Sequence, residues 1–188
     1  MKPEVMRMKS FVIPLLLAVI LTSCAKTPDK NDAMKEPGKK PDQKETAADV
    51  TTPKVTGIGG IFFRCDDPKA IKEWYGKNLG LAIDEYGSPF EFRNANRPDE
   101  INYLQWSPFK KNTKYFEPSQ KEFMINYRVQ NIEGLVKNLR DNGVTIVDTI
   151  ETYEYGKFVH IMDPDGNKLE LWEPIDSILT RIGTKTTK

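Results

Sequence analysis

The sequence is poor in histidine and cysteine, and this limits the chemistry it can perform. Its 188 residues include 1 His and 2 Cys. A single histidine excludes a metal site built from several histidines, and a Ser/His or Cys/His hydrolase would depend wholly on His160. Two cysteines cannot form a disulfide scaffold. P-loop, dinucleotide-binding and zinc-spacing motifs are missing as well.

The chain also lacks an excess of charge. It carries 28 Lys+Arg against 27 Asp+Glu, a formal net charge of +1. A near-neutral chain has no electrostatic footprint for general nucleic-acid binding, so we expect no nucleic-acid partner. No apolar run reaches the roughly 20 residues that a membrane-spanning helix needs. The length allows one domain of ordinary size.

The first 24 residues form a distinct segment with a basic start and a short apolar run. The run FVIPLLLAVIL at residues 11–21 contains Pro14 and is typical of a secretory signal peptide. The following LTSC at residues 21–24 resembles the bacterial lipobox, in which a cysteine is lipidated and becomes the new N-terminus. We therefore predict a signal peptide over residues 1–23 and lipidation of Cys24. The alternative is an ordinary signal peptide that contains a cysteine.

A tether is predicted between the anchor and the folded domain. Residues 25–54 hold seven Lys, six Asp or Glu and four Pro, and no aromatic residue. Such a stretch cannot bury enough apolar surface to offset its conformational entropy, so we expect a disordered tether over residues 24–54. We therefore expect a membrane-anchored, extracytoplasmic lipoprotein that faces the periplasm in a Gram-negative cell and the outside in a Gram-positive one.

Residues 55–174 are the part of the chain that can form a core. They contain all three Trp, all seven Tyr and eight of the nine Phe. The tail at residues 175–188 is predicted to fray after one helical turn within residues 175–182. The 120-residue domain is divided into two modules, at about residues 55–113 and 121–174.

The two modules are related by an internal repeat. GIFFRCDDPKAIKEWYGKNLGLAI at residues 60–83 aligns with MINYRVQNIEGLVKNLRDNGVTIV at residues 124–147, an offset of 64. Each copy begins with an alternating strand and continues through a capped helix that ends near a glycine. Three shorter strands follow in each copy, so the predicted plan is βαβββ twice, with strands at about 81–86, 89–94, 101–107, 144–150, 154–162 and 167–173.

Alternation along the opening strands separates two faces. We expect one face to pack under the helices; it comprises Ile61, Phe63, Cys65, Ile125, Tyr127 and Val129. The opposite face is mixed and must face a shared concave side, here called the cup, or solvent; it comprises Gly60, Phe62, Arg64, Met124, Asn126 and Arg128.

The repeat and the closing segment YGKFVHIMDPDGNKLELWEP resemble the vicinal oxygen chelate superfamily, the group of glyoxalase I, bleomycin-resistance proteins and extradiol dioxygenases. The resemblance covers residues 58–174. It implies an α+β fold in which paired βαβββ modules form a cupped mixed sheet with helices on the outside. Function does not follow, because one fold hosts many activities.

The metal enzymes of this family hold a divalent ion in the cup. The resemblance places the four ligand positions at Gly60, Met124, Gln105 and Glu170. Glycine offers no donor, and a thioether is too soft for Mg²⁺, Mn²⁺ or Fe²⁺. Only Gln105 and Glu170 remain as weak metal ligands, so a divalent metal is the less favoured cofactor and any other cofactor is unknown.

His160 is the polar residue expected beside Glu170. The turn at residues 164–166 pairs the last two strands so that these side chains lie opposite each other, at about 4.5–5.5 Å between Cβ atoms. They are the candidate catalytic pair, with Glu170 orienting His160 or taking a proton from a substrate. The alternative is a satisfied polar pair within a half-buried sheet.

Further cup residues are candidates for ligand binding. Arg64 and Arg128 could bind an anion or lie at a solvated rim, and a buried Asn126 needs a partner that a ligand could supply. Residues 109–116 form either a flap over the cup or a plain linker. Cys65 is predicted to be buried and inert. The ligand-binding candidates are Gln105, Asn126, Arg128, Arg64, Trp172 and Met124.

The sequence leaves three functions open. The first is a glyoxalase-like lyase or isomerase that acts on a small polar molecule without the usual four-ligand metal site. The second is a module of the bleomycin-resistance type that sequesters a ligand without turnover. The third is a lipoprotein that binds another protein and has a vestigial cup. The expected partners are a small molecule, the membrane through Cys24, and a second copy of the chain as a candidate homodimer.

Overall fold

The computed structural model describes residues 51–95, 97–183 and 185–188. The predicted signal peptide, Cys24 and residues 25–50 of the tether lie outside this part. The described residues include the end of the predicted tether, where the backbone carbonyls of Thr51 and Thr52 accept hydrogen bonds from the side chains of Asn131 and Gln130. Within the described residues, no helix has the length and apolar character needed to cross a bilayer.

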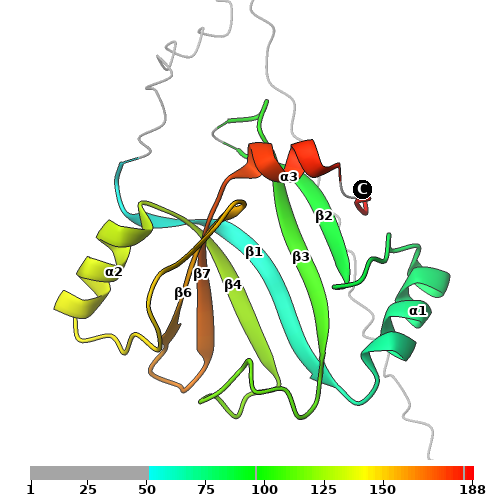
Figure 1. The fold of residues 1–188 in the computed structure, drawn as a ribbon, viewed down its shortest axis with the longest axis horizontal. Helices are drawn as coiled ribbons and strands as arrows, with labels where there is room; N and C mark the ends of the chain where they lie inside the picture. Colours follow the sequence, from blue (N-terminus) through cyan, green and yellow to red (C-terminus); the bar gives the residue numbers. More distant parts are fainter. Residues whose placement is uncertain (1–50, 96, 184) are drawn as a thin grey trace, which may run out of the picture. The chain divides into compact units, whose positions relative to one another are not determined.

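Seven strands form one mixed sheet (Figure 1). The strands at the centre, β1 and β4, are antiparallel, and each has the last strand of its own module as a parallel neighbour, β3 and β7. The sheet order is β2-β3-β1-β4-β7-β6-β5. This confirms the α+β fold of paired modules, with strands β1 (Lys54–Cys65), β2 (Ser88–Arg93), β3 (Ile101–Lys110), β4 (Phe123–Gln130), β5 (Glu151–Tyr153), β6 (Gly156–Met162) and β7 (Lys168–Pro174).

The strands that follow each helix differ from the prediction: the first module has one fewer, and the second has shorter ones. Residues 81–86 form no strand, because the Asp84 carboxylate accepts the backbone N–H groups of Tyr86 and Gly87, each at 2.8 Å, and so closes a local turn. Residues 144–150 make only one isolated bridge, between Ile146 and Ile161. The predicted strand at 154–162 divides into a turn and β6.

Helices α1 (Pro68–Leu79) and α2 (Ile132–Asp141) begin and end where the sequence predicts. Asp67 caps α1 by accepting the N–H groups of Lys69 and Ala70, each at 3.0 Å. Proline suits the first turn because it has no N–H to lose there. The C-cap of α1, Gly80, has a φ of 73°, a left-handed conformation that glycine adopts without steric cost.

The two helices bury different amounts of surface. Helix α2 places Ile132 and Val136 in the main core, which also contains Val129, Val159, Ile161 and Leu171. Helix α1 buries no residue completely and lies against β3. Phe63 lies on the helix-facing side, where its ring contacts that of Trp106 at 5.3 Å between centroids. Ile61 is 41% exposed, however, and Cys65 is only half-buried, because α1 lies beside β3 and does not cover β1.

The fraying predicted for the C-terminal tail is not seen in the described residues 175–183 and 185–188. Helix α3 (Asp176–Ile182) forms two turns. Beyond it, Thr187 lies against the β2 edge of the sheet. Its N–H donates to the carbonyl of Pro89 at 2.8 Å, and its hydroxyl lies 2.8 Å from that of Ser88 and accepts the N–H of Ala82 at 2.6 Å. The sequence missed this pairing because the segment has no apolar period.

Two glycines of β1 give a matched test of how closely the sheet packs on its cup side. A Cβ at Gly59 would overlap Oδ1 of Asn126 and lie 2.9 Å from Cε3 of Trp172, whereas a Cβ at Gly57 meets only Cδ of Arg128 at 3.9 Å. We expect Gly59→Ala to lower the free energy of unfolding by about 1–3 kcal/mol. Gly57→Ala should change it by about 0.5 kcal/mol or less. Urea denaturation of both variants measures the difference, and equal losses would contradict it.

Candidate functional site

A row of residues crosses the five inner strands of the sheet. In register, Gln105 on β3 lies beside Gly60 on β1, which faces Asn126 on β4. Asn126 in turn lies beside Glu170 on β7, which faces His160 on β6. The predicted pairing of His160 with Glu170 is therefore present. Asn126, and not Met124, takes the place expected for the first-strand ligand of the second module.

Glu170 is the centre of this row and is only 3% exposed. Its Oε1 accepts a hydrogen bond from Nδ2 of Asn126 at 2.5 Å. Its Oε2 lies 3.0 Å from Nε2 of His160 and also accepts the hydroxyl of Tyr115. Three polar side chains from three different segments thus converge on one buried carboxylate, whose lone pairs burial would otherwise leave unsatisfied.

Asp148 holds the far side of the His160 ring. Its Oδ2 lies 2.6 Å from Nδ1, and its Oδ1 accepts the backbone N–H of His160 at 2.8 Å. The Asp148 carboxylate binds the backbone N–H of His160, which a neighbouring strand would otherwise use. Residues 144–150 therefore do not form a continuous strand beside β6. Asp148 was not predicted, because nothing in the local sequence pattern distinguishes it from a solvated loop aspartate.

The charge state of His160 follows from its two partners. Both ring nitrogens face carboxylate oxygens, so both hydrogen bonds are satisfied together when both nitrogens donate, as in the imidazolium. Burial by itself lowers the pKa of His160. The hydrogen bond and negative charge of Glu170, together with the hydrogen bond to Asp148, outweigh burial and raise that pKa above its usual value, although Lys168 opposes them.

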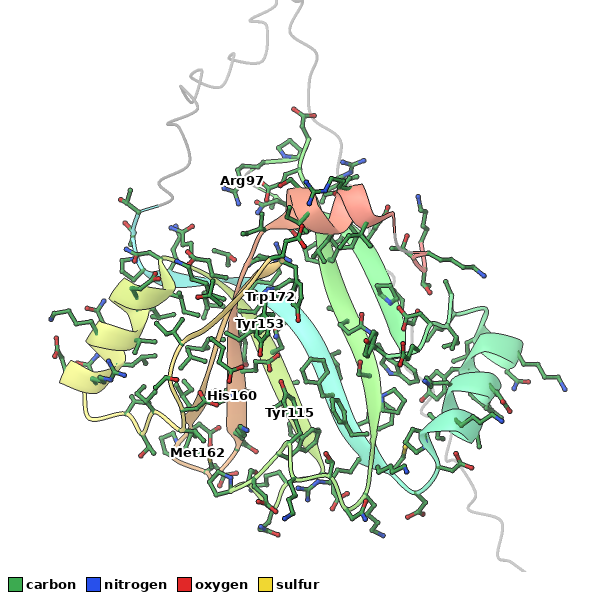
Figure 2. The ribbon with its side chains drawn as sticks, in the orientation of Figure 1. Arg97, Tyr115, Tyr153, His160, Met162 and Trp172 are labelled. Carbon is green, nitrogen blue, oxygen red and sulfur yellow. The ribbon has the colours of Figure 1, made fainter. Side chains whose placement is uncertain are left out.

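The segment between the modules covers Glu170. Tyr115 stacks on Phe109 with ring centroids 5.3 Å apart and meets the His160 ring edge-on at 5.4 Å. Nζ of Lys168 donates to the Tyr115 carbonyl at 2.7 Å. Figure 2 shows Tyr115 and His160 beside each other over the inner strands. Burial and the negative charge of Glu170 raise the pKa of the Tyr115 hydroxyl far above its usual value.

Phe116 anchors this segment. Its side chain is 0% exposed and belongs to an apolar cluster with Phe62 and Met124, against which Phe109 packs. Of the two alternatives for residues 109–116, the flap is therefore the one that the structure contains. Met124 serves this cluster as an apolar contact and does not lie at the carboxylate.

Arg128 and Trp172 lie on the cup side, two residues along their strands from Asn126 and Glu170. The Arg128 guanidinium forms an ion pair with Asp176 and donates to the Tyr103 carbonyl at 3.0 Å. It also lies over the Trp172 ring at 5.1 Å. The sequence missed Asp176 because it treated the tail as frayed.

Arg64 and Gln105 lie apart from this group. The Arg64 guanidinium lies 5.1 Å from the centre of the Phe116 ring, and Nη2 donates to the Ser119 carbonyl at 3.4 Å. Arg64 therefore holds the flap and does not join Arg128. Nε2 of Gln105 donates to the hydroxyl of Ser107 at 3.2 Å.

The donor set does not fit a four-ligand metal centre. Gly60 brings no donor, and both oxygens of Glu170 already accept hydrogen bonds. The His160 ring lies between two carboxylates, so the three groups are arranged in a chain and do not converge on one point. Among the described residues, no group of three His, Cys, Asp or Glu side chains could hold an ion.

The fold and the repeated module define the class of protein, and comparison with known families identifies it. The family model for the Glyoxalase/Bleomycin resistance protein/Dioxygenase superfamily matches residues 57–171. The chain therefore belongs to this superfamily, as the sequence resemblance predicted. No curated protein matches the chain.

Solved structures that match the chain do so at low sequence identity. The methylmalonyl-CoA epimerase from Mycobacterium tuberculosis is 20% identical with a TM-score of 0.45, covering 67% of this chain and 93% of that one. A Streptomyces coelicolor methylmalonyl-CoA epimerase variant in complex with 2-nitronate-propionyl-CoA is 17% identical, with a TM-score of 0.48 and coverage of 65% and 99%. The Mn(II)-bound glyoxalase from Novosphingobium aromaticivorans is 14% identical, with a TM-score of 0.45 and coverage of 65% and 40%.

Proposed function

We propose that this domain is a metal-independent proton-transfer enzyme, a glyoxalase-like lyase or isomerase, that acts on a small polar carbonyl compound in the cup. The observation that supports it is the chain of contacts from Asp148 through His160 to the buried carboxylate of Glu170. A carboxylate held in one orientation, beside a fixed cation and away from bulk water, is well placed to exchange a proton with a bound substrate.

In the proposed reaction, Glu170 takes a proton from the carbon next to the substrate carbonyl. The electron pair of the broken C–H bond moves into an enolate, and the negative charge develops on the carbonyl oxygen. The positive charge of the His160 imidazolium and the Asn126 N–H that does not bind Glu170 are the nearby groups that stabilise this charge. Glu170 then returns the proton to the same carbon or to its neighbour, which restores the carboxylate.

Access to Glu170 requires Tyr115 to leave. Its hydroxyl occupies the carboxylate oxygen that faces away from Asn126. The Tyr115 residue is nevertheless 40% exposed, so its ring lies at the mouth of the cup. A substrate oxygen or C–H group replaces the hydroxyl when the ring turns outward. The flap therefore excludes water from Glu170 until a substrate is bound.

The cellular setting is part of the same proposal. Lipidation of Cys24 after removal of residues 1–23 would anchor the domain outside the cytoplasm through a flexible tether. A protein in that location rarely meets the cytosolic glutathione adducts on which glyoxalase I acts, which favours a different small carbonyl substrate. Its partners are then this substrate and the membrane, with a second copy of the chain as a further candidate.

Deuterium exchange tests the proposal without knowledge of the natural substrate. Hydroxyacetone and 2-oxobutyrate are incubated with the full chain in D2O, and loss of the proton signal next to each carbonyl is followed by NMR. We expect exchange with at least one probe, and Glu170→Gln should slow it by about 100-fold or more, because the base is removed while its shape is kept.

Glu73→Gln is the matched control, since it makes the same chemical change at an exposed site on α1. It should exchange at the rate of the unchanged protein. Saturable binding of a probe without exchange would overturn the enzyme and favour the ligand-sequestering module. Neither binding nor exchange of either probe would favour the protein-binding lipoprotein with a vestigial cup.

A further inference from the structure

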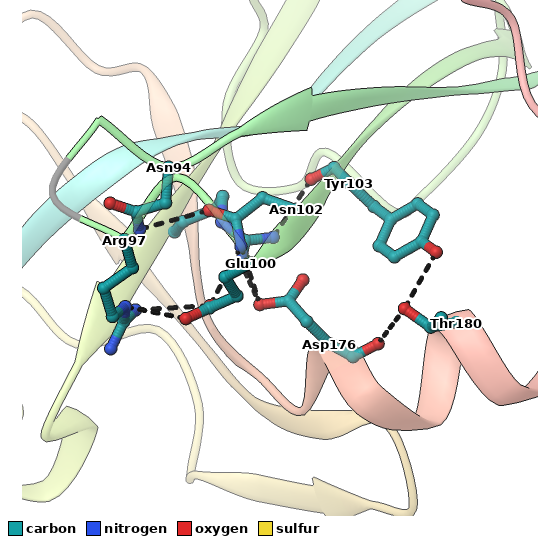
Figure 3. Close-up of polar contacts among 8 residues, drawn as sticks. Asn94, Arg97, Glu100, Asn102, Tyr103, Asp176 and Thr180 are labelled. Atoms are coloured by element: carbon teal, nitrogen blue, oxygen red, sulfur yellow. Dashed lines mark hydrogen bonds and ion pairs between the residues drawn. The ribbon is translucent and has the colours of Figure 1, made fainter.

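The deepest positive charge in the described structure is neutralised by a residue of the C-terminal helix. Arg128 is 3% exposed, and its ion-pair partner Asp176 belongs to α3. Oδ2 of Asp176 also accepts Nδ2 of Asn102 at 3.2 Å, as Figure 3 shows for these two residues. Oδ1 of Asp176 is buried and has no hydrogen-bond partner. The carboxylate of Asp176 is therefore only half satisfied in this position.

The buried position of Asp176 does not favour the charged form of its carboxylate. Burial raises the pKa of Asp176 above its usual value, even though the hydrogen bond and positive charge of Arg128 act in the opposite direction. Arginine can grip a carboxylate with two parallel hydrogen bonds, but this pair uses only one oxygen of Asp176. A carboxylate that is not tied to a helix could align both of its oxygens.

The helix that supplies Asp176 is weakly held. Helix α3 has seven residues and buries none of them completely. Apart from Asp176, its side-chain link to the sheet is the Thr180 hydroxyl, 3.1 Å from that of Tyr103 (Figure 3). Displacement of α3 therefore exposes no residue that is completely buried within the helix itself, breaks the exposed ion pair of Arg181 with Glu154, and frees the guanidinium of Arg128.

Arg128 is also placed correctly with respect to the reacting centre. On β4 it lies two residues from Asn126, on the same cup-side face of the sheet, and its neighbour Trp172 lies two residues from Glu170. Two residues along a strand span about 7 Å. A short acid held at Arg128 by its carboxylate can therefore present a carbon next to its carbonyl to Glu170.

We propose that Arg128 is the carboxylate anchor of the cup, that the substrate is a small carboxylic acid carrying a carbonyl group, and that Asp176 occupies the anchor until the acid displaces it. This inference rests on the proposed function, because it names the substrate class of the same site. Asp176 of α3 then competes with the substrate for Arg128, and the cup binds acids in preference to neutral carbonyl compounds.

The test compares an acid with its neutral amide. Binding of 2-oxobutyrate and of 2-oxobutyramide to the full chain is measured by ligand-observed NMR titration. In Asp176→Asn, we expect 2-oxobutyrate to bind about tenfold more tightly than in the unchanged protein, because the competing carboxylate is gone, and 2-oxobutyramide to bind as before. Adding Arg128→Met to Asp176→Asn should abolish the gain.

Thr180→Val is the matched control for a merely loosened helix. It removes the link to Tyr103 and leaves the pair of Arg128 with Asp176 intact, so the affinity for 2-oxobutyrate should rise far less than in Asp176→Asn. An equal gain for acid and amide in Asp176→Asn, or no gain for either, overturns the anchor. A gain of the same size in Thr180→Val also overturns it.

A second measurement uses the unchanged protein, in case Asp176→Asn does not fold. Saturating 2-oxobutyrate should accelerate amide hydrogen exchange in residues 178–182, while 2-oxobutyramide should not; equal exchange with both overturns the proposal. The outcome is separate from that of the Glu170→Gln assay. Glu170-dependent exchange without an acid preference rejects only the anchor, and an Arg128-dependent acid preference without exchange rejects only the enzyme.

Discussion

Replacing Phe116 by alanine is expected to lower the free energy of unfolding by about 3–5 kcal/mol. The side chain is fully buried among Phe62, Phe109 and Met124, and the Arg64 guanidinium lies on its ring. Truncation leaves a cavity that these neighbours cannot close completely. Because Phe116 is adjacent to Tyr115, the same change should release the flap from Glu170.

Two measurements separate these effects of Phe116→Ala. Urea denaturation gives the loss of stability, and tyrosine hydrogen bonding in the folded state is followed through the hydroxyl proton of Tyr115 by NMR. Phe123→Ala is the control, because that ring is 49% exposed and should cost about 1 kcal/mol or less. Similar losses for the two variants would contradict the anchoring role of Phe116.

The pKa of His160 should lie above its usual value, and Asp148→Asn should lower it. The ring faces Asp148 and Glu170 at its two nitrogens and the edge of Tyr115, with Lys168 nearby on β7. Asp148→Asn removes one of the two negative charges that face the ring and replaces a charged hydrogen-bond acceptor at Nδ1 by a neutral one. The His160 ring then gains its proton at a lower pH.

The raised pKa of His160 also sets the pH dependence of stability. Its contribution is complete below the unfolded-state value of about 6.5 and is lost as the pH rises through the higher pKa of the folded state. Because the chain has 1 His, the Cε1 proton of His160 can be followed by NMR without assignment. Equal titration midpoints for the unchanged protein and Asp148→Asn would contradict the role given to Asp148.

The sequence predicted the fold and the centre of the site because both depend on periodic patterns. Strand alternation and the turn at residues 164–166 were sufficient to place His160 opposite Glu170. The same counting placed Met124 where the structure has Asn126. The helices begin at Pro68 and Ile132, 64 residues apart, whereas the register pairs Gly60 with Asn126, 66 residues apart, and a repeat offset taken through the helices does not reveal this difference.

The other missing residues lie in segments without a period. Tyr115 and Asp148 reach the site from connecting segments, and Asp176 reaches it from a helix too short to show an apolar stripe. The position of such residues depends on tertiary contacts, which a single sequence does not display. The row of strand residues was therefore predictable, while the groups that close over it were not.

The pairing of Thr187 with β2 has a consequence for assembly. Open sheet edges invite other chains to add a strand, and folded proteins protect them by covering or shortening them. Here the tail covers part of the β2 edge, and the opposite edge, β5, has only three residues. Neither edge offers a long template for fibre formation or strand exchange. A homodimer of this domain should therefore associate through helices or sheet faces, and removal of residues 185–188 should increase its tendency to aggregate.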